Sequence, residues 1–304
     1  MMSSGASNFV HGVDLTFFII LGISVFFLVT ITAAMIYFVI RYRRKKNPKA
    51  SQIEGNNTLE IIWTVIPTIL VLIMFYYGWI GYKPMRRVPA DAIPVKAYGQ
   101  MWSWSFEYSN GKKSAELVVP LNKPVKLDLI SKDVNHSLYI PAFRIKEDVI
   151  PGRNNYMWFK ALQEGEYDIF CSEYCGERHS YMLSKVRVIP EAEYLAWLEK
   201  SDIPADEPPG LTLMKQNACI TCHSLDGSKI VGPSFKGIYG EKVTVTTDSG
   251  EKEVTVDDEY IRRSIYEPGA EIVKGFNKGL MISYKDKLKD EDIKSITDYI
   301  KTLK

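Results

Sequence analysis

The 304-residue sequence contains only four cysteines and four histidines. So few cysteines exclude a disulfide framework as the basis of the fold. Basic residues barely outnumber acidic ones, with 38 Lys and Arg against 36 Asp and Glu, which argues against a general nucleic-acid-binding protein and predicts no nucleic-acid partner. Six of the eight Cys and His residues fall in two short clusters. The sequence therefore points to metal chemistry.

Two long apolar segments lie near the N-terminus. Residues 15–39 contain no charged side chain, and a second run extends from Ile61 to Ile80. Each segment is long enough to cross the hydrocarbon core of a lipid bilayer as a helix. We therefore expect residues 1–90 to form a transmembrane hairpin, with helices at about 15–40 and 60–82.

The charges beside these segments predict their orientation. The loop at residues 41–49 reads RYRRKKNPK, whereas residues 1–14 contain no Lys or Arg. Loops on the cytoplasmic side of a membrane are enriched in Lys and Arg. This places the loop in the cytoplasm and everything from about residue 83 onward on the opposite side.

Two further domains are predicted after the hairpin. Residues 91–200 contain short runs of alternating hydrophobicity separated by Gly, Pro and Asn, which is typical of an all-β sandwich or Greek-key barrel. Residues 201–210, SDIPADEPPG, predict a linker. From 211 to 304 the pattern is helical, and the last segment places Ile293, Ile296, Ile300 and Leu303 on one face. The predicted fold is thus a multidomain membrane protein with a helical hairpin, an all-β domain and an all-α domain.

The first Cys and His cluster reads CSEYCGERHSYM from Cys171 to Met182, and His136 lies upstream in DVNHS. Thiolate and thioether sulfur together with imidazole favour copper. A mononuclear blue-copper site uses one Cys, which would leave a second thiolate unused. We therefore expect Cys171 and Cys175 to bridge two copper ions, each capped by His136 or His179. A disulfide and an inert buried pair are the alternatives.

The second cluster is CITCH at residues 219–223. This C-x-x-C-H motif is typical of covalent haem attachment, in which Cys219 and Cys222 form thioethers and His223 is an axial ligand of the iron. A redox dithiol or half of a zinc site is the alternative. The absence of a second C-x-x-C favours haem c.

The other axial ligand can be narrowed by elimination. Residues 211–304 contain no His besides His223, and their only methionines are Met214 and Met281. Met214 lies five residues before Cys219, too close in sequence to reach the opposite haem face. Met281 is therefore the expected ligand, and the alternative is that Met281 only fills the core.

These motifs, with GQMWSWSFEY and the two-helix anchor before them, resemble subunit 2 of the haem-copper cytochrome c oxidases. The C-terminal region resembles a class I cytochrome c. The resemblance implies a cupredoxin domain with a binuclear CuA centre. The ligands that it implies are His136, Cys171, Cys175, His179, Met182 and the backbone carbonyl of Glu173. It further implies that the Glu173 side chain reaches a magnesium ion at the interface with the catalytic subunit, and that Trp102 lies at the surface that accepts electrons.

The resemblance also implies a respiratory role. Electrons from a donor cytochrome or an upstream respiratory complex would pass through haem c and CuA to a catalytic subunit 1, accompanied by a subunit 3, which reduces oxygen to water with proton pumping. The protein would span the bacterial inner membrane with both soluble domains on the periplasmic side. A CuA-containing subunit of a nitric oxide reductase and a stand-alone membrane-anchored electron carrier are the alternatives.

Glu60, in LEIIWT, resembles the acidic residue at the cytoplasmic mouth of a proton-uptake route in that family. The alternative is a structural role, because Asn57 and Glu60 have the spacing of a capping box at the start of the second membrane helix.

Overall fold

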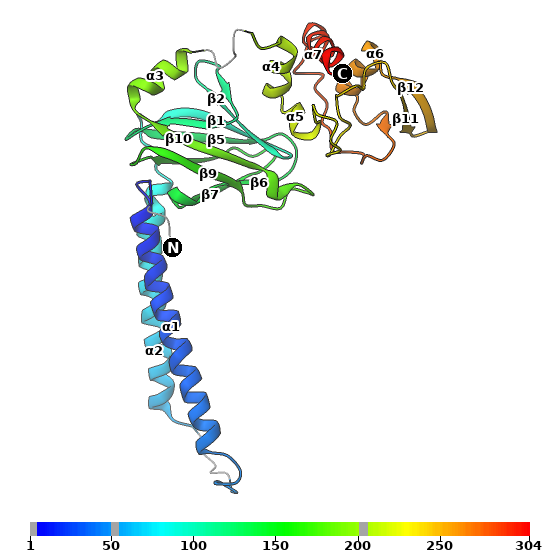
Figure 1. The fold of residues 1–304 in the computed structure, drawn as a ribbon. Helices are drawn as coiled ribbons and strands as arrows, with labels where there is room; N and C mark the ends of the chain where they lie inside the picture. Colours follow the sequence, from blue (N-terminus) through cyan, green and yellow to red (C-terminus); the bar gives the residue numbers. More distant parts are fainter. Residues whose placement is uncertain (1–4, 50–54, 201–205) are drawn as a thin grey trace.

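The computed structural model describes residues 5–49, 55–200 and 206–304. It shows a long helical hairpin, a β-sandwich at one end of the hairpin, and a smaller domain beside the sandwich (Figure 1). The predicted linker at 201–210 lies partly outside the described residues. Its last two positions begin a helix, α4 (Pro209–Gln216).

The hairpin consists of α1 (Val10–Arg41) and α2 (Asn57–Met85), which extend beyond both ends of the predicted helices. Neither helix contains a buried residue, and both are long and apolar enough to cross a membrane. Gly12 and Gly81 face each other across the hairpin, and a Cβ atom on Gly81 would lie in van der Waals contact with the Gly12 carbonyl oxygen, at 3.8 Å. Small residues at such contacts are typical of packed membrane helices.

Two ion pairs connect the hairpin to the sandwich. Arg144 Nε lies 2.8 Å from Asp14 Oδ1 in α1, and Arg86 Nη1, directly after α2, lies 2.8 Å from Glu147 Oε2. Both pairs are partly shielded from water, which reduces the screening that weakens exposed pairs. They help to fix the orientation of the sandwich relative to the membrane.

The sandwich consists of two five-stranded sheets with the strand orders β3-β2-β1-β5-β8 and β4-β10-β9-β6-β7. The strand bounds are β1 Ile93–Gln100, β2 Ser103–Tyr108, β3 Lys113–Ser114, β4 Leu117–Pro120, β5 Pro124–Ser131, β6 His136–Ile140, β7 Ile145–Val149, β8 Asn155–Lys160, β9 Gly165–Cys171 and β10 Leu183–Ile189. Two short 3-10 helices are η1 (Pro141–Phe143) and η2 (His179–Tyr181). β1 pairs with β5, and β4 with β10, in parallel, so the chain crosses between the sheets as in a Greek key.

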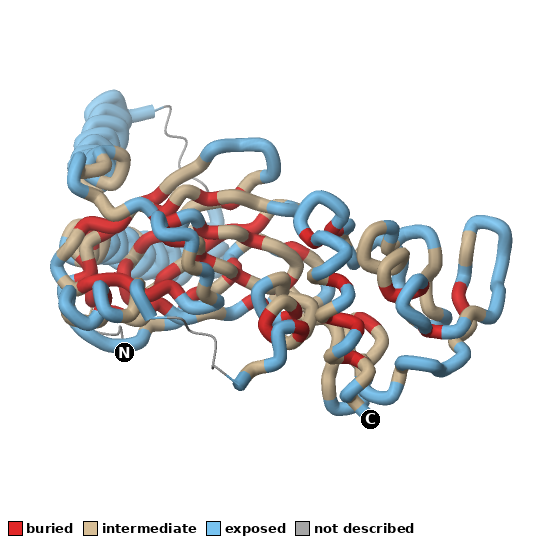
Figure 2. The backbone as a smooth tube through the Cα atoms, turned by 90° about the horizontal axis from the view of Figure 1, so that it is seen from above, coloured by how far each residue is buried: buried red, intermediate tan, exposed pale blue. Residues whose placement is uncertain are grey.

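The core of the sandwich lies between the sheets (Figure 2). The predicted alternation in β5 is confirmed: Val125, Leu127 and Leu129 are buried, while Lys126 and Asp128 remain partly accessible. Helix α3 (Glu191–Glu199) closes the domain.

The C-terminal domain is built on helices α4, α5 (Cys219–Cys222), α6 (Asp258–Tyr266) and α7 (Asp290–Thr302). The predicted buried face of α7 is confirmed for its three isoleucines. The domain also carries a small sheet in the order β12-β11-β13 that the sequence analysis did not predict. Its strands are β11 Lys242–Thr247, β12 Gly250–Thr255 and β13 Ile272–Val273.

The C-terminal domain packs against the sandwich. Cys222, Val231 and Leu280 contact the hydrophobic core cluster of the sandwich. Arg178 Nη1 donates a hydrogen bond to the carbonyl of Thr221 at 3.2 Å. Because Arg178 precedes His179 and Thr221 lies in the CITCH motif, this contact brings together the segments that carry the two Cys and His clusters.

Candidate functional site

The loop between β9 and β10 gathers the side chains of the first cluster. The Sγ atoms of Cys171 and Cys175 lie 3.8 Å apart. The Nδ1 atom of His136, at the start of β6, lies 3.9 Å from Cys171 Sγ. On the other side, His179 Nδ1 and Met182 Sδ lie 3.5 Å and 3.8 Å from Cys175 Sγ. The five side chains predicted from the sequence therefore meet at one place.

The backbone completes this arrangement. The carbonyl oxygen of Glu173 lies 3.2 Å from Cys171 Sγ. Both cysteines are free thiols, and their sulfur atoms are far beyond the roughly 2.05 Å of a disulfide. Two thiols, two imidazoles, a thioether and a carbonyl fit a dinuclear copper centre. The Glu173 side chain makes no hydrogen bond or ion pair within the described residues.

The sequence analysis missed Asp133. Its Oδ1 lies 2.8 Å from His136 Nε2, and its Oδ2 accepts a hydrogen bond from the Met101 backbone N–H at 2.7 Å. A carboxylate that holds one imidazole nitrogen fixes the tautomer and directs the other nitrogen to a metal. The sequence signal that could have identified Asp133 is its position three residues before His136 in KDVNH.

The protonation of the cluster depends on its burial and its internal contacts. Burial disfavours the imidazolium of His136, but the hydrogen bonds with Asp133 and Cys171 outweigh it and raise the pKa of His136 to about 8. Burial likewise opposes ionisation of Cys171, yet its contact with His136 holds the pKa of this thiol below its usual value. Burial and then the neighbouring Cys171 raise the pKa of Cys175. Metal binding must therefore release protons and weaken as the pH falls.

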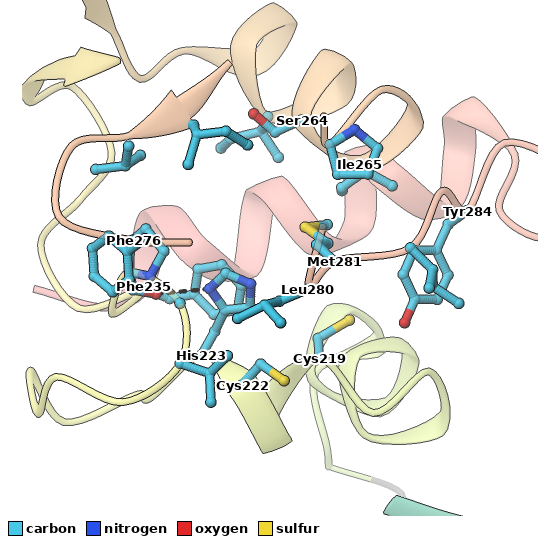
Figure 3. Close-up of a pocket in the computed structure, with 18 of the residues that line it drawn as sticks. Cys219, Cys222, His223, Phe235, Ser264, Ile265, Phe276, Leu280, Met281 and Tyr284 are labelled. Carbon is cyan, nitrogen blue, oxygen red and sulfur yellow. Dashed lines mark hydrogen bonds between the residues drawn. The ribbon is translucent and has the colours of Figure 1, made fainter. Parts of the chain in front are cut away.

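The second cluster lines an apolar cavity in the C-terminal domain (Figure 3). Cys219 and Cys222 lie at the ends of α5, His223 follows, and Met281 reaches the same cavity from residues that precede α7. Met281 is 37% exposed, whereas Met214 is fully buried in the helical core and does not line the cavity.

His223 is held in a defined orientation. Its Nδ1 lies 2.8 Å from the carbonyl of Pro233, which leaves Nε2 free to bind a metal. Its ring stacks on Phe235 with the ring centroids 4.5 Å apart. A Cβ atom at Gly232 would lie 2.5 Å from His223 Cε1, so only glycine fits there. An apolar cavity with a C-x-x-C-H motif and a methionine on its lining fits a covalently attached haem.

Trp102 differs from its expected exposure. It lies in the turn between β1 and β2 and is only 2% exposed. Its ring lies against the copper loop, because a Cβ atom on Gly176 would lie 3.1 Å from Trp102 Cζ2. Its Nε1 donates a hydrogen bond to the carbonyl of Cys175 at 3.2 Å. The preceding residue, Met101, lines the cavity of the second cluster. Trp102 is thus interior and lies between the two clusters.

Glu60 lies exposed in the first turn of α2. The N-cap of this helix is Asn56, whose side chain accepts a hydrogen bond from the backbone N–H of Leu59 at 3.1 Å. The alternative of a capping box from Asn57 to Glu60 is therefore wrong, because the cap lies one residue earlier. Within the described residues the Glu60 carboxylate makes no hydrogen bond or ion pair.

Comparison with protein families assigns the three parts of the chain. Residues 1–78 match the family model "Cytochrome C oxidase subunit II, transmembrane domain", residues 112–189 match "Cytochrome C oxidase subunit II, periplasmic domain", and residues 209–304 match "Cytochrome c". Cytochrome c oxidase subunit 2 of Alkalihalophilus pseudofirmus is 32% identical over 94% of this chain and 86% of the relative. The chain belongs to the cytochrome c oxidase subunit 2 family.

A second curated relative agrees with this assignment, and one solved structure is reported with it. Cytochrome c oxidase subunit 2 of Bacillus subtilis is 29% identical over 88% of this chain and 82% of its own length. Among solved structures, the periplasmic domain of subunit II of cytochrome oxidase of Bradyrhizobium japonicum is 37% identical, covering 37% of this chain and 95% of that chain with a TM-score of 0.36.

Membership defines the general role of the chain. It is a membrane-anchored electron-transfer subunit of a haem-copper oxidase complex, and its two soluble domains imply CuA copper and haem c. The predicted anchor, cupredoxin-like domain and cytochrome c domain are confirmed.

Proposed function

We propose that this subunit accepts electrons at its cytochrome c domain and delivers them through its copper domain to a catalytic subunit 1 that reduces oxygen to water and pumps protons. We place it in a bacterial inner membrane, with a subunit 3 in the same complex. The names of the matched relatives support oxygen rather than nitric oxide as the final acceptor. The bound haem and copper ions would supply one-electron redox chemistry.

The contact between the two soluble domains carries this proposal. Trp102 donates a hydrogen bond to the backbone of Cys175, and its neighbour Met101 lines the cavity that contains Cys219 and Cys222. The Met101–Trp102 peptide and the hydrogen bond from Trp102 to Cys175 would therefore form a route between the two sites. Covalent fusion also keeps the cytochrome domain at a high effective concentration beside the copper domain.

The proposed ligands divide between the copper site and the haem site, and neighbouring groups orient two of their histidines. His136, Cys171, Cys175, His179, Met182 and the Glu173 carbonyl would hold copper, and Cys219, Cys222, His223 and Met281 would hold haem. Asp133 would orient His136, and the Pro233 carbonyl would orient His223. Cys171 and Cys175 are buried, so little solvent would have to reorganise around their sulfur atoms during electron transfer.

The copper loop is also suited to contact a partner. Tyr174 is 76% exposed, and Tyr181 and Leu183 are exposed beside it. Large apolar side chains that gather on a surface indicate a protein interface. We propose that this surface meets the catalytic subunit and that the Glu173 carboxylate binds a magnesium ion there.

Trp102→Phe tests the route between the domains. This variant keeps an aromatic ring in the core but loses the hydrogen bond to Cys175, so we expect normal copper and haem content with several-fold slower electron transfer from haem c to copper. The measurement is optical detection of both centres after rapid injection of one electron. Trp197→Phe is the matched control, because Trp197 lies in α3 and packs on Tyr108 at the end of β2. An unchanged rate in Trp102→Phe would contradict the route.

We also propose that Glu60 collects protons at the cytoplasmic end of α2. Its carboxylate is exposed beside the basic loop, and Asn56 already caps the helix. Glu60→Gln removes the ionisable group alone, so we expect normal assembly but several-fold slower steady-state oxygen consumption. Asn56→Ala is the control, since it removes the cap, at a cost of about 1 kcal/mol, and keeps the carboxylate. Normal turnover in Glu60→Gln would exclude this role.

A further inference from the structure

Tyr284 connects three segments that the proposed function requires to remain together. Its hydroxyl donates a hydrogen bond to the carbonyl of Asn217 at 2.9 Å and accepts one from Gln100 Nε2 at 3.0 Å. Asn217 lies two residues before Cys219, and Gln100 lies two residues before Trp102. Tyr284 itself follows Met281 by three residues and lines the haem cavity (Figure 3).

Polar contacts between the domains are few. Among the residues that the structure describes, two side-chain hydrogen bonds cross from the sandwich to the cytochrome domain: Gln100 to Tyr284, and Arg178 to the Thr221 carbonyl. The rest of the contact consists of apolar packing, which is non-directional and does not by itself fix one docked arrangement. The two hydrogen bonds must therefore supply much of the directionality.

Tyr284 is well suited to this role. It is buried, so water competes little for its hydroxyl. The bond to Asn217 directs the hydroxyl, and its remaining oxygen lone pair faces the amide of Gln100. The backbone N–H of Tyr284 also donates to the Ile265 carbonyl at 3.1 Å, which anchors the residue in the cytochrome domain.

We infer that Tyr284 is a positioning residue that holds the cytochrome c domain docked on the copper domain through its hydrogen bond with Gln100. This inference rests on the proposed electron route, but it concerns the docked arrangement of the domains rather than either cofactor site. Loss of the hydroxyl should loosen the docking and leave the ligands of both sites unchanged.

Tyr284→Phe in the full chain tests the inference by hydrogen–deuterium exchange. Exchange of the backbone amides in residues 99–103 and 217–222 reports opening of the interface. We expect protection of these amides to fall roughly 2- to 10-fold, the change that corresponds to one hydrogen bond of ordinary strength. Haem c to copper electron transfer should slow, while the haem spectrum, the midpoint potentials of both centres and the copper content stay at wild-type values.

Tyr266→Phe is the matched control. The Tyr266 hydroxyl lies 3.1 Å from the Leu288 carbonyl and 3.0 Å from Asp290 Oδ1, so this variant loses tyrosine hydrogen bonding that lies within the cytochrome domain. It should leave protection at 99–103 unchanged. Gln100→Leu removes the same cross-domain bond from the other side, and its effect should not add to that of Tyr284→Phe.

Wild-type protection at 99–103 in Tyr284→Phe, an equal loss in Tyr266→Phe, or an unchanged electron-transfer rate at unchanged potentials would overturn the inference. Failure of the proposed function gives a different result. In that case the wild-type chain itself would show no transfer from haem c to copper, whatever the exchange data show.

Discussion

Cys175→Ser is expected to yield a chain that keeps its covalent haem and loses the dinuclear copper centre. The Cys175 sulfur is the atom that joins the two halves of the cluster, since it lies near Cys171 on one side and near His179 and Met182 on the other. A serine hydroxyl is a hard donor that does not ionise near neutral pH, so it cannot replace a bridging thiolate. Electron transfer from haem c to copper should be abolished.

Copper analysis and electron paramagnetic resonance of the purified chain measure this effect. The control is Ser172→Ala, because Ser172 lies in the same loop but is exposed. We expect two copper ions per chain in the control and a spectrum of one unpaired electron shared by both ions. Two shared copper ions in Cys175→Ser would show that Cys175 does not bridge the centre.

Met281→Ala is expected to remove the sulfur ligand of the haem iron without releasing the haem. The thioethers at Cys219 and Cys222 would keep the haem attached, while the potential should drop, because Met/His ligation raises it. The drop should be a sizeable fraction of the roughly 0.8 V range that axial ligands span. Optical spectroscopy and redox titration measure both effects.

Met214→Leu is the control for this variant. Met214 is fully buried in the helical core, where leucine nearly conserves its volume, so the potential should stay unchanged. A wild-type potential in Met281→Ala together with a lowered potential in Met214→Leu would contradict this prediction and show that Met214 is the haem ligand.

Local patterns were sufficient to predict most of the fold. The alternation in β5 and the isoleucine face of α7 are set by short-range periodicity, and the structure confirms both. The β11–β12 hairpin also had a local signal, because Val and Thr residues flank the turn at Asp248 and Ser249, but the helical pattern of the C-terminal segment was extended to the whole domain. The cap of α2 was misplaced by one residue because Asn56 and Asn57 are equally good caps in sequence.

The features that were missed depend on tertiary contacts. Gln100 and Tyr284 are 184 residues apart in sequence, so no periodicity could predict their hydrogen bond. Trp102 is buried and contacts the copper loop at Cys175, 73 residues away in sequence, and an aromatic residue in a turn carries no local signal of such a contact. Asp133 is different, because it lies three residues before His136 and its spacing was a local signal that the structure shows to be a contact.

The central claim is that one chain carries both redox sites and passes electrons directly between them. Rapid injection of one electron into haem c of the purified full chain tests this claim, with the reduced haem and the oxidised copper absorption bands followed together. The account predicts that haem c reoxidises as the copper band bleaches by an equivalent amount, at a rate independent of protein concentration. A rate proportional to concentration, or haem reoxidation without loss of the copper band, would contradict it.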